Sequence, residues 1–142
     1  VGGNTQDNIS RKPAKTAYQN EVVKPVPGST SSNGETEHPA KIGLMYASDY
    51  GFAADPSAWT LTMGSYNNTT ATSTNWMYMG LSEWTISRYA DTAYYVFYVN
   101  YNGSVAGDLA SDALTVRPVF YLTSSVNYVS GSGTTADPIT IN

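Results

Sequence analysis

The chain has 142 residues, of which 44 are Thr, Ser or Asn and 12 are Tyr, a composition that fits one domain built mainly of strands and loops. It has no Cys and one His, which excludes disulfide frameworks, thiolate nucleophiles and zinc sites made of Cys or paired His. Its net charge of −4 lacks the broad positive field that draws proteins to nucleic acids and anionic membranes, so we expect no nucleic-acid partner.

Residues 1–39 are predicted to form a flexible N-terminal arm or linker that contributes little to the core. Large apolar residues are sparse there, and residues 24–39 form a run rich in Pro, Gly and Ser. His38 lies in this run, so we interpret it as a solvated residue and not as a catalytic base. Residues 16–23 are the exception, because their pattern suits an edge strand or a segment that docks on a neighbouring subunit.

Residues 40–142 are predicted to form the folded domain, beginning with a buried strand at residues 41–46 and a turn at residues 48–51. Asp55 followed by Pro56 predicts the start of a short helix. The Asp side chain can accept a hydrogen bond from the first turn, and Pro lacks the N–H group that this turn would leave unpaired.

The rest of the chain reads as strands and turns. Strands are predicted at residues 83–88, 93–100, 103–106 and 114–122, with short closing strands at Tyr128 and at residues 139–141. Asn102-Gly103 indicates a tight hairpin between the second and third of these strands. Pro118 after Arg117 indicates a strand end or a sheet edge.

Period-two alternation along residues 93–100 separates two faces of that strand. We assign Phe97 and Val99 to the core and Tyr98 and Asn100 to the exposed face. Trp76 and Trp84 are also assigned to the core.

The acidic residues do not form a convincing catalytic pair. Asp55 is explained as a helix cap and Asp137, before a Pro, as a turn residue. Asp108 and Asp112 share one loop and could offer oxygens to Ca²⁺, but the regular spacing of a calcium loop is absent, so solvated loop acids are the simpler interpretation. We therefore expect no metal, no cofactor and no enzymatic activity.

Tyr residues crowd residues 75–112, interleaved with Asn and Asp. This is the chemistry of binding loops, because Tyr gives a large contact area at low entropic cost while small polar residues adapt their hydrogen bonds. The competing interpretation is that these Tyr lie half buried along the strands. The candidate ligand-binding residues are Tyr78, Tyr89, Asp91, Tyr94, Tyr98, Asn100, Asn102, Asp108 and Asp112.

Several segments of residues 40–140 carry a family resemblance. They are residues 41–53 (KIGLMYASDYGFA), Asn75-Trp76, residues 83–88 (EWTISR), residues 94–97, residues 116–122 (VRPVFYL) and residues 131–138. As a set they resemble prokaryotic surface-type domains related to the C-type lectin fold. The order of the Trp84-x-x-x-Arg88 segment, a variable stretch and a closing Val-Arg strand is similar to the variable proteins of diversity-generating retroelements.

The resemblance implies an α+β fold of C-type lectin type, with a small twisted antiparallel sheet, one or two short helices and long loops. It implies a scaffold that displays a face tolerant of substitution and used to bind ligands. In the retroelement proteins, mutagenesis at template adenines converts AAY-type codons into codons for residues that include Asn, Tyr, Asp, Ser and Thr. The chain departs from the sugar-binding lectins, since it lacks Trp-Asn-Asp, Glu-Pro-Asn, Gln-Pro-Asp and disulfides. The formylglycine-generating oxidases share this fold, but they need metal-binding or reactive Cys residues, and the chain has none. Arg117 is expected to act structurally, bonding backbone carbonyls or an acid such as Glu83.

We therefore predict a ligand-binding variable protein of receptor or adhesin type, diversified by a retroelement, whose partner is a protein or another cell-surface ligand. No segment approaches the roughly 18–20 apolar residues of a membrane helix and no leader opens the chain, so we expect no membrane insertion. A Cys-free surface of this kind suits an extracellular or cell-surface location. Two alternatives stay open: a structural subunit of a pilus-like appendage or cell envelope, with residues 1–38 as a stalk or exchanged strand, and a fixed carbohydrate-binding module.

Overall fold

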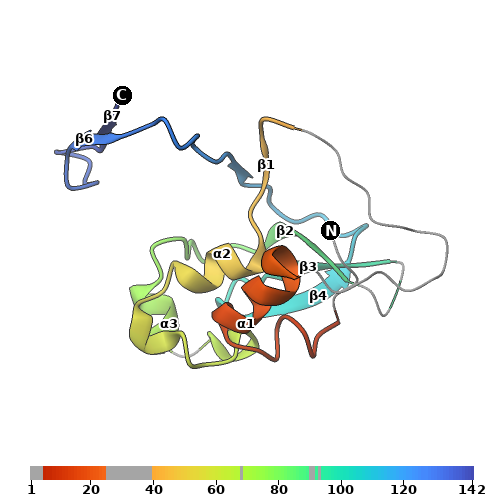
Figure 1. The fold of residues 1–142 in the computed structure, drawn as a ribbon. Helices are drawn as coiled ribbons and strands as arrows, with labels where there is room; N and C mark the ends of the chain where they lie inside the picture. Colours follow the sequence, from red (N-terminus) through yellow and green to blue (C-terminus); the bar gives the residue numbers. More distant parts are fainter. Residues whose placement is uncertain (1–4, 25–39, 68, 90–91, 93) are drawn as a thin grey trace.

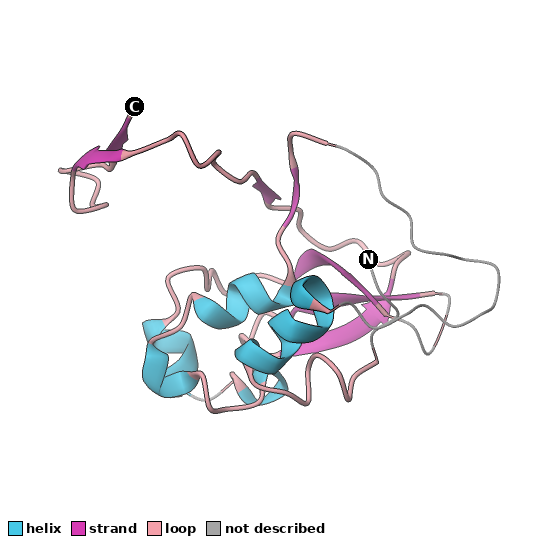
Figure 2. Ribbon diagram, viewed as in Figure 1, coloured by secondary structure: helices cyan, strands magenta, loops and turns pink. Residues whose placement is uncertain are grey.

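The computed structural model describes residues 5–24, 40–67, 69–89, 92 and 94–142. Helices and antiparallel strands both occur in these residues, so the predicted α+β class is confirmed. In Figure 1 and Figure 2 the helices lie against the strands of the main sheet, and the C-terminal part of the chain leads away from this body.

Short helices carry much of the body. In the described residues the α-helices are α1 (Ala14–Tyr18), α2 (Ala47–Phe52) and α3 (Thr69–Thr74). A π-helical turn, Gln19–Val23, continues α1, and 3-10 turns occur at Pro56–Ala58 and Met63–Ser65. Helix α1 packs against α2, which places the N-terminal segment on the body.

The main sheet is an antiparallel meander of β2 (Glu83–Arg88), β3 (Tyr95–Val99) and β4 (Val105–Leu109). A second pair joins β1 (Gly43–Leu44) to β5 (Pro118–Val119). The remaining pair joins β6 (Tyr128–Ser130) to β7 (Thr140–Ile141). The chain before α2 reaches the free edge of β2, where the Ile86 N–H donates to the Met45 carbonyl at 2.9 Å.

The hairpin predicted at Asn102-Gly103 is confirmed. The Asn100 N–H donates to the Ser104 carbonyl at 2.8 Å, and the Gly103 N–H donates to the Asn100 carbonyl at 2.7 Å. Gly103 has a φ of +89°. A Cβ there would lie 2.3 Å from Cγ2 of Thr72, so the turn needs glycine both for its backbone conformation and for its contact with α3.

The core lies between the helices and the inner face of the main sheet. Phe97 and Val99 are buried there, as predicted. Two buried tyrosines keep their hydroxyls paired: Tyr50 donates to the Gly103 carbonyl at 3.0 Å, and Tyr66 donates to the Gly51 carbonyl at 3.2 Å. These bonds let large aromatic side chains fill the core without leaving a buried polar atom unpaired.

The N-terminal segment differs from its prediction. Residues 16–23 are helical and do not form an edge strand. Residues 5–24 belong to the folded body, contrary to the predicted flexible arm, because Ile9, Ala14 and Ala17 are fully buried. Ala14 and Ala17 share one face of α1 at a spacing of three residues, and their small side chains allow the close approach to α2. The rest of the predicted arm, residues 1–4 and 25–39, lies outside the described residues.

Glu21 joins this segment to the body through a buried carboxylate. Its Oε2 accepts the Ser48 N–H at 3.1 Å, and its Oε1 accepts the Ser87 hydroxyl. Burial raises the pKa of Glu21, while the bonds from Ser48 and Ser87 act in the opposite direction.

The region from residue 41 to residue 74 is more helical than predicted. The strand expected at residues 41–46 is reduced to Gly43–Leu44, and the turn expected at residues 48–51 is part of α2. Asp55 caps its turn as predicted, since its Oδ1 accepts the Ser57 N–H at 2.9 Å, but the turn is a single 3-10 turn. Helix α3 forms in a part of the chain that was read from the sequence as strands and turns.

The C-terminal extension, residues 120–142, also differs in part. Of the strand expected at residues 114–122, only Pro118–Val119 is a strand. The closing strands near Tyr128 and residues 139–141 are confirmed, but they pair with each other and away from the body (Figure 1). The exposed large apolar residues of the extension are Phe120, Tyr121, Leu122, Tyr128, Val129, Ile139 and Ile141.

Arg117 has the structural role that was predicted for it. One of its guanidinium nitrogens, Nη2, donates to Oε1 of Glu83 at 2.5 Å and to the Met77 carbonyl at 2.7 Å. Because Glu83 is buried, the pair lies mostly out of water and fixes the segment before β5 against β2. Across the described ranges, no helix has the length and apolar character needed to cross a membrane.

Candidate ligand-binding site

Tyr89 lies in the core, so its prediction as a binding residue is wrong. Its ring packs 4.9 Å from Phe97 and 5.4 Å from Tyr95, measured between centroids. Alternate residues of β2 from Glu83 to Ser87 face inward, and Tyr89 continues that alternation. The same periodicity that was applied to β3 would have placed Tyr89 inside if it had been extended from β2.

Tyr98 is also misplaced by the prediction, because its side chain is only 9% exposed. It lies opposite Trp84 across the two strands, and the rings meet edge to face at 6.1 Å. The Trp84 ring covers Tyr98, so Tyr98 is buried. Trp84 was predicted as core, but it is only half buried.

The structure brings Asp108 and Asp112 together near Tyr98. Partial desolvation and then the neighbouring carboxyl of Asp108 raise the pKa of Asp112. Burial, followed by the charges of Asp108 and Asp112, raises the pKa of Tyr98. Within the described residues no group of three or more His, Cys, Asp or Glu could hold a metal ion.

The remaining candidates are spread over the surface. Asn102 is a turn residue, since its Oδ1 accepts the Ser104 N–H at 3.0 Å, and the backbone of Asn100 closes the same hairpin. The Tyr78 hydroxyl donates to the Tyr101 carbonyl at 2.9 Å. Tyr94 is exposed at the far end of β3. Asp91 lies outside the described residues.

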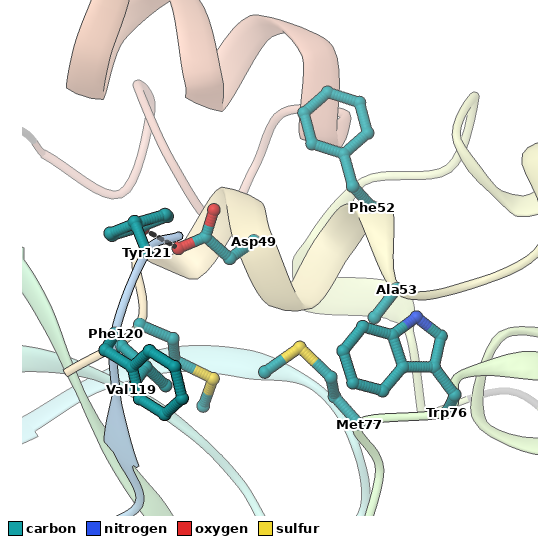
Figure 3. Close-up of a pocket in the computed structure, with 9 residues that line it drawn as sticks. Asp49, Phe52, Ala53, Trp76, Met77, Val119, Phe120 and Tyr121 are labelled. Atoms are coloured by element: carbon teal, nitrogen blue, oxygen red, sulfur yellow. Dashed lines mark hydrogen bonds between the residues drawn. The ribbon is translucent and has the colours of Figure 1, made fainter. Parts of the chain in front are cut away.

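A different surface feature has the shape of a binding site. It is an aromatic pocket of about 330 Å³ between α2, the turn after α3 and the segment that follows β5 (Figure 3). We call it the aromatic pocket. Its lining residues are Met45, Asp49, Phe52, Ala53, Trp76, Met77, Val119, Phe120 and Tyr121.

Trp76 forms one side of the aromatic pocket and is 80% exposed, so its assignment to the core is wrong. The preceding residue, Asn75, explains its position. Asn75 is buried, its side-chain amide donates to the Tyr50 carbonyl at 2.9 Å, and its Oδ1 accepts the Met77 N–H at 2.9 Å. Because Asn75 and Met77 are both buried, the backbone between them turns the Trp76 ring toward solvent.

The opposite side of the aromatic pocket is held by β5 and α2. Val119 pairs with Gly43, which carries Phe120 and Tyr121 to the pocket. The Tyr121 hydroxyl donates to Oδ2 of Asp49 at 2.7 Å, and the same oxygen accepts the Tyr46 N–H at 2.8 Å. Burial, then Asp49, raises the pKa of Tyr121, so the phenol stays protonated as a donor.

The aromatic pocket was missed because large aromatic residues were assigned to the core by default. Trp76 was assigned to the core, and Phe120 and Tyr121 were predicted only as part of the strand at residues 114–122 and of the family resemblance. A second hollow, of about 400 Å³, lies beside Arg11, Gly64 and Val105, but no aromatic ring lines it.

Comparisons with known proteins give no relative. No family model, no curated protein and no solved structure matches the chain.

Proposed function

We propose that this chain is a ligand-binding domain of receptor or adhesin type, which holds a protein ligand at the aromatic pocket. The observation that carries the proposal is Trp76, which is 80% exposed beside an apolar hollow whose lining also includes Phe120 and Tyr121. Exposed aromatic rings that rim a concave apolar surface are characteristic of places where a partner is bound.

The chemistry of the pocket supports binding in place of catalysis. Asp49 is the one carboxylate among the lining residues, and its Oδ2 already accepts two hydrogen bonds. The other titratable group of the lining is Tyr121, which donates to Asp49 and whose pKa is raised by burial, so the lining pairs Asp49 with no base or activated nucleophile. The rings and two Met side chains instead offer a large, adaptable apolar contact area.

The finer parts of the proposal come from the sequence resemblance. They are a fold of C-type lectin type, display at the cell surface and diversification by a retroelement. Tyr94, Asp108 and Asp112 lie at least partly exposed and remain the members of the predicted patch best suited to vary. A reverse-transcriptase gene beside the source gene, with a near-copy differing mainly at adenines, would support diversification, and its absence would contradict it.

A second candidate function, a structural subunit of an appendage or envelope, is favoured by the exposed apolar residues of the C-terminal extension. The N-terminal segment is a poor exchanged strand, because residues 5–24 pack in the body. The extension would then join copies of the chain. Sedimentation at rising concentration tests this, since a subunit would assemble and a variant lacking residues 123–142 would not.

The binding proposal can be tested by NMR with a library of small aromatic and aliphatic fragments. The chain has three Trp, and each indole N–H gives its own signal. We expect fragments to shift the Trp76 signal and to leave that of Trp59, whose Nε1 donates to the Ala54 carbonyl at 2.8 Å, unchanged. Trp76→Ala should abolish binding at the neighbouring backbone amides. Fragment binding elsewhere, or none, would contradict the proposal.

A further inference from the structure

The aromatic pocket combines two chemistries in one small volume. Its floor is apolar and flexible, made by Met45, Met77 and Val119. Trp76 and Phe120 lie on opposite sides of it, with Met77 between them, and Asp49 lies above (Figure 3). A pocket that offers an apolar surface beside aromatic rings and a carboxylate suits a side chain with an aliphatic stem and a positive head.

The charges around the pocket favour a cation. Asp49 is the one charged residue among those that line it. Both of its hydrogen bonds use Oδ2, which leaves Oδ1 without a hydrogen-bonding partner among the described residues. Burial, then Asp49 and more weakly Glu21, raises the pKa of Tyr121, so both carboxylates act on the pocket. Exposed aromatic faces add to this attraction, since their π-electrons attract cations.

We propose that the aromatic pocket binds a lysine-type side chain of the protein ligand, with its stem on Met45, Met77 and Val119 and its ammonium between the aromatic rings and Asp49. This inference rests on the proposed function, because it names the group that the pocket receives. An N-methylated lysine would fit the same chemistry, since methylation keeps the charge and enlarges the face presented to the rings.

The test uses three blocked amino acids titrated into the full chain: N-acetyl-lysine methylamide, its trimethylated form and N-acetyl-norleucine methylamide. Norleucine has the stem without the ammonium and is the matched control. We expect both cationic compounds to shift the Trp76 indole signal with an affinity at least about fivefold higher than that of the norleucine compound. The preference should weaken in high salt.

Two variants locate the effect. Asp49→Asn keeps an oxygen that can accept from Tyr46 and Tyr121, and it should reduce the preference for the cations over norleucine to about twofold or less. Asp7→Asn changes an exposed carboxylate that is neither a candidate binding residue nor part of the pocket lining, and it should leave the preference unchanged. Melting curves of both variants show whether either one unfolds. The salt dependence in the wild-type chain tests the charge without any substitution.

The outcomes separate the two proposals. Equal affinity for lysine and norleucine compounds in the wild-type chain would overturn the cation inference and leave the pocket a general apolar binding site. Binding of choline but of neither lysine compound would also overturn it, because the ligand would then be a headgroup and not a protein side chain. If no compound and no fragment moves the Trp76 signal, the binding function of the pocket itself is wrong.

Discussion

The two ends of the described chain reverse the roles that their compositions suggest. Residues 5–24 are polar and short of large apolar side chains, yet Ile9, Ala14 and Ala17 are completely buried. The C-terminal extension carries eight large apolar residues, and all of them except Val126 are exposed. The difference shows that burial follows from how closely a segment can approach the body, more than from its hydrophobicity.

The contact between α1 and α2 shows how this close approach is achieved. A Cβ added at Gly51 would lie 2.7 Å from the Cβ of Ala14 and 2.7 Å from the sulfur of Met63. The two helices therefore meet closely at an Ala-Gly contact, and the rings of Tyr18 and Phe52 pack edge to face beside it. In the extension, Phe120 and Tyr121 reach the aromatic pocket, and the strands that follow them, β6 and β7, pair with each other.

The largest expected effect comes from the same substitution made at both ends. Ile9→Ala removes a fully buried side chain and should lower the free energy of unfolding by about 2–5 kcal/mol. Ile141→Ala changes a residue that is 45% exposed and should cost less than about 0.5 kcal/mol. Urea denaturation measures both. Similar losses at the two sites would show that the extension packs on the body.

A pair of glycine substitutions sharpens the comparison further. Gly51→Ala forces a new Cβ into the contact between α1 and α2, and overpacking of this kind costs about 1–3 kcal/mol. At Gly131, where φ is +103°, a Cβ would lie 2.0 Å from the Pro138 carbonyl oxygen, so Gly131→Ala should disrupt the β6–β7 hairpin.

The readouts of the two glycine variants should differ. Gly51→Ala should lower the melting temperature of the body. Gly131→Ala should change only the NMR signals of the extension. A drop in body stability caused by Gly131→Ala would contradict the separation of the two regions.

The successes of the sequence prediction were local. The Asn102-Gly103 hairpin and the inward side of β3 follow from turn chemistry and from period-two alternation, and both signals lie within a few residues. The pairing of Arg117 with Glu83 is an exception, because these residues are 34 apart in sequence and the prediction rested on the ability of a guanidinium to bond carbonyls or an acid. The α+β class was predicted from the family resemblance and not from these local signals.

The failures came from contacts that no local pattern encodes. Trp76 is exposed because the Asn75 side chain bonds the distant Tyr50 carbonyl and fixes the turn. Helix α2 contains Gly51, which reads as a turn until its contact with Ala14 is known. The aromatic pocket joins residues 49 and 121, which are brought together by the pairing of β1 with β5. The candidate site was therefore beyond what spacing alone could predict.

The pH dependence of stability tests how the N-terminal segment is held. Burial raises the pKa of Glu21 above its ordinary 4.5, so the folded chain binds this proton more tightly than the unfolded chain does. Glu21 therefore costs stability at neutral pH, and that cost falls as the pH falls through the folded pKa toward 4.5. Glu21→Gln removes the titration.

The measurement is the free energy of unfolding of the wild-type chain and of Glu21→Gln between pH 7.5 and about pH 5. We expect the wild-type value to rise relative to that of the variant as the pH falls. Parallel profiles would mean that Glu21 is solvated and that the N-terminal segment is not locked on the body through this carboxylate.

The smallest expected effect is the most direct test of the comparison. Every hydrogen bond identified for residues 123–142 is made within that segment, as between Asn127 and Asn142. A two-stranded hairpin of this size adds little stability by itself. Removing residues 123–142 leaves Tyr121 and its bond to Asp49 in place and should change the free energy of unfolding by less than about 0.5 kcal/mol. A loss of several kcal/mol would place the extension on the body in solution, and its exposed apolar residues would then be the covering of a second core.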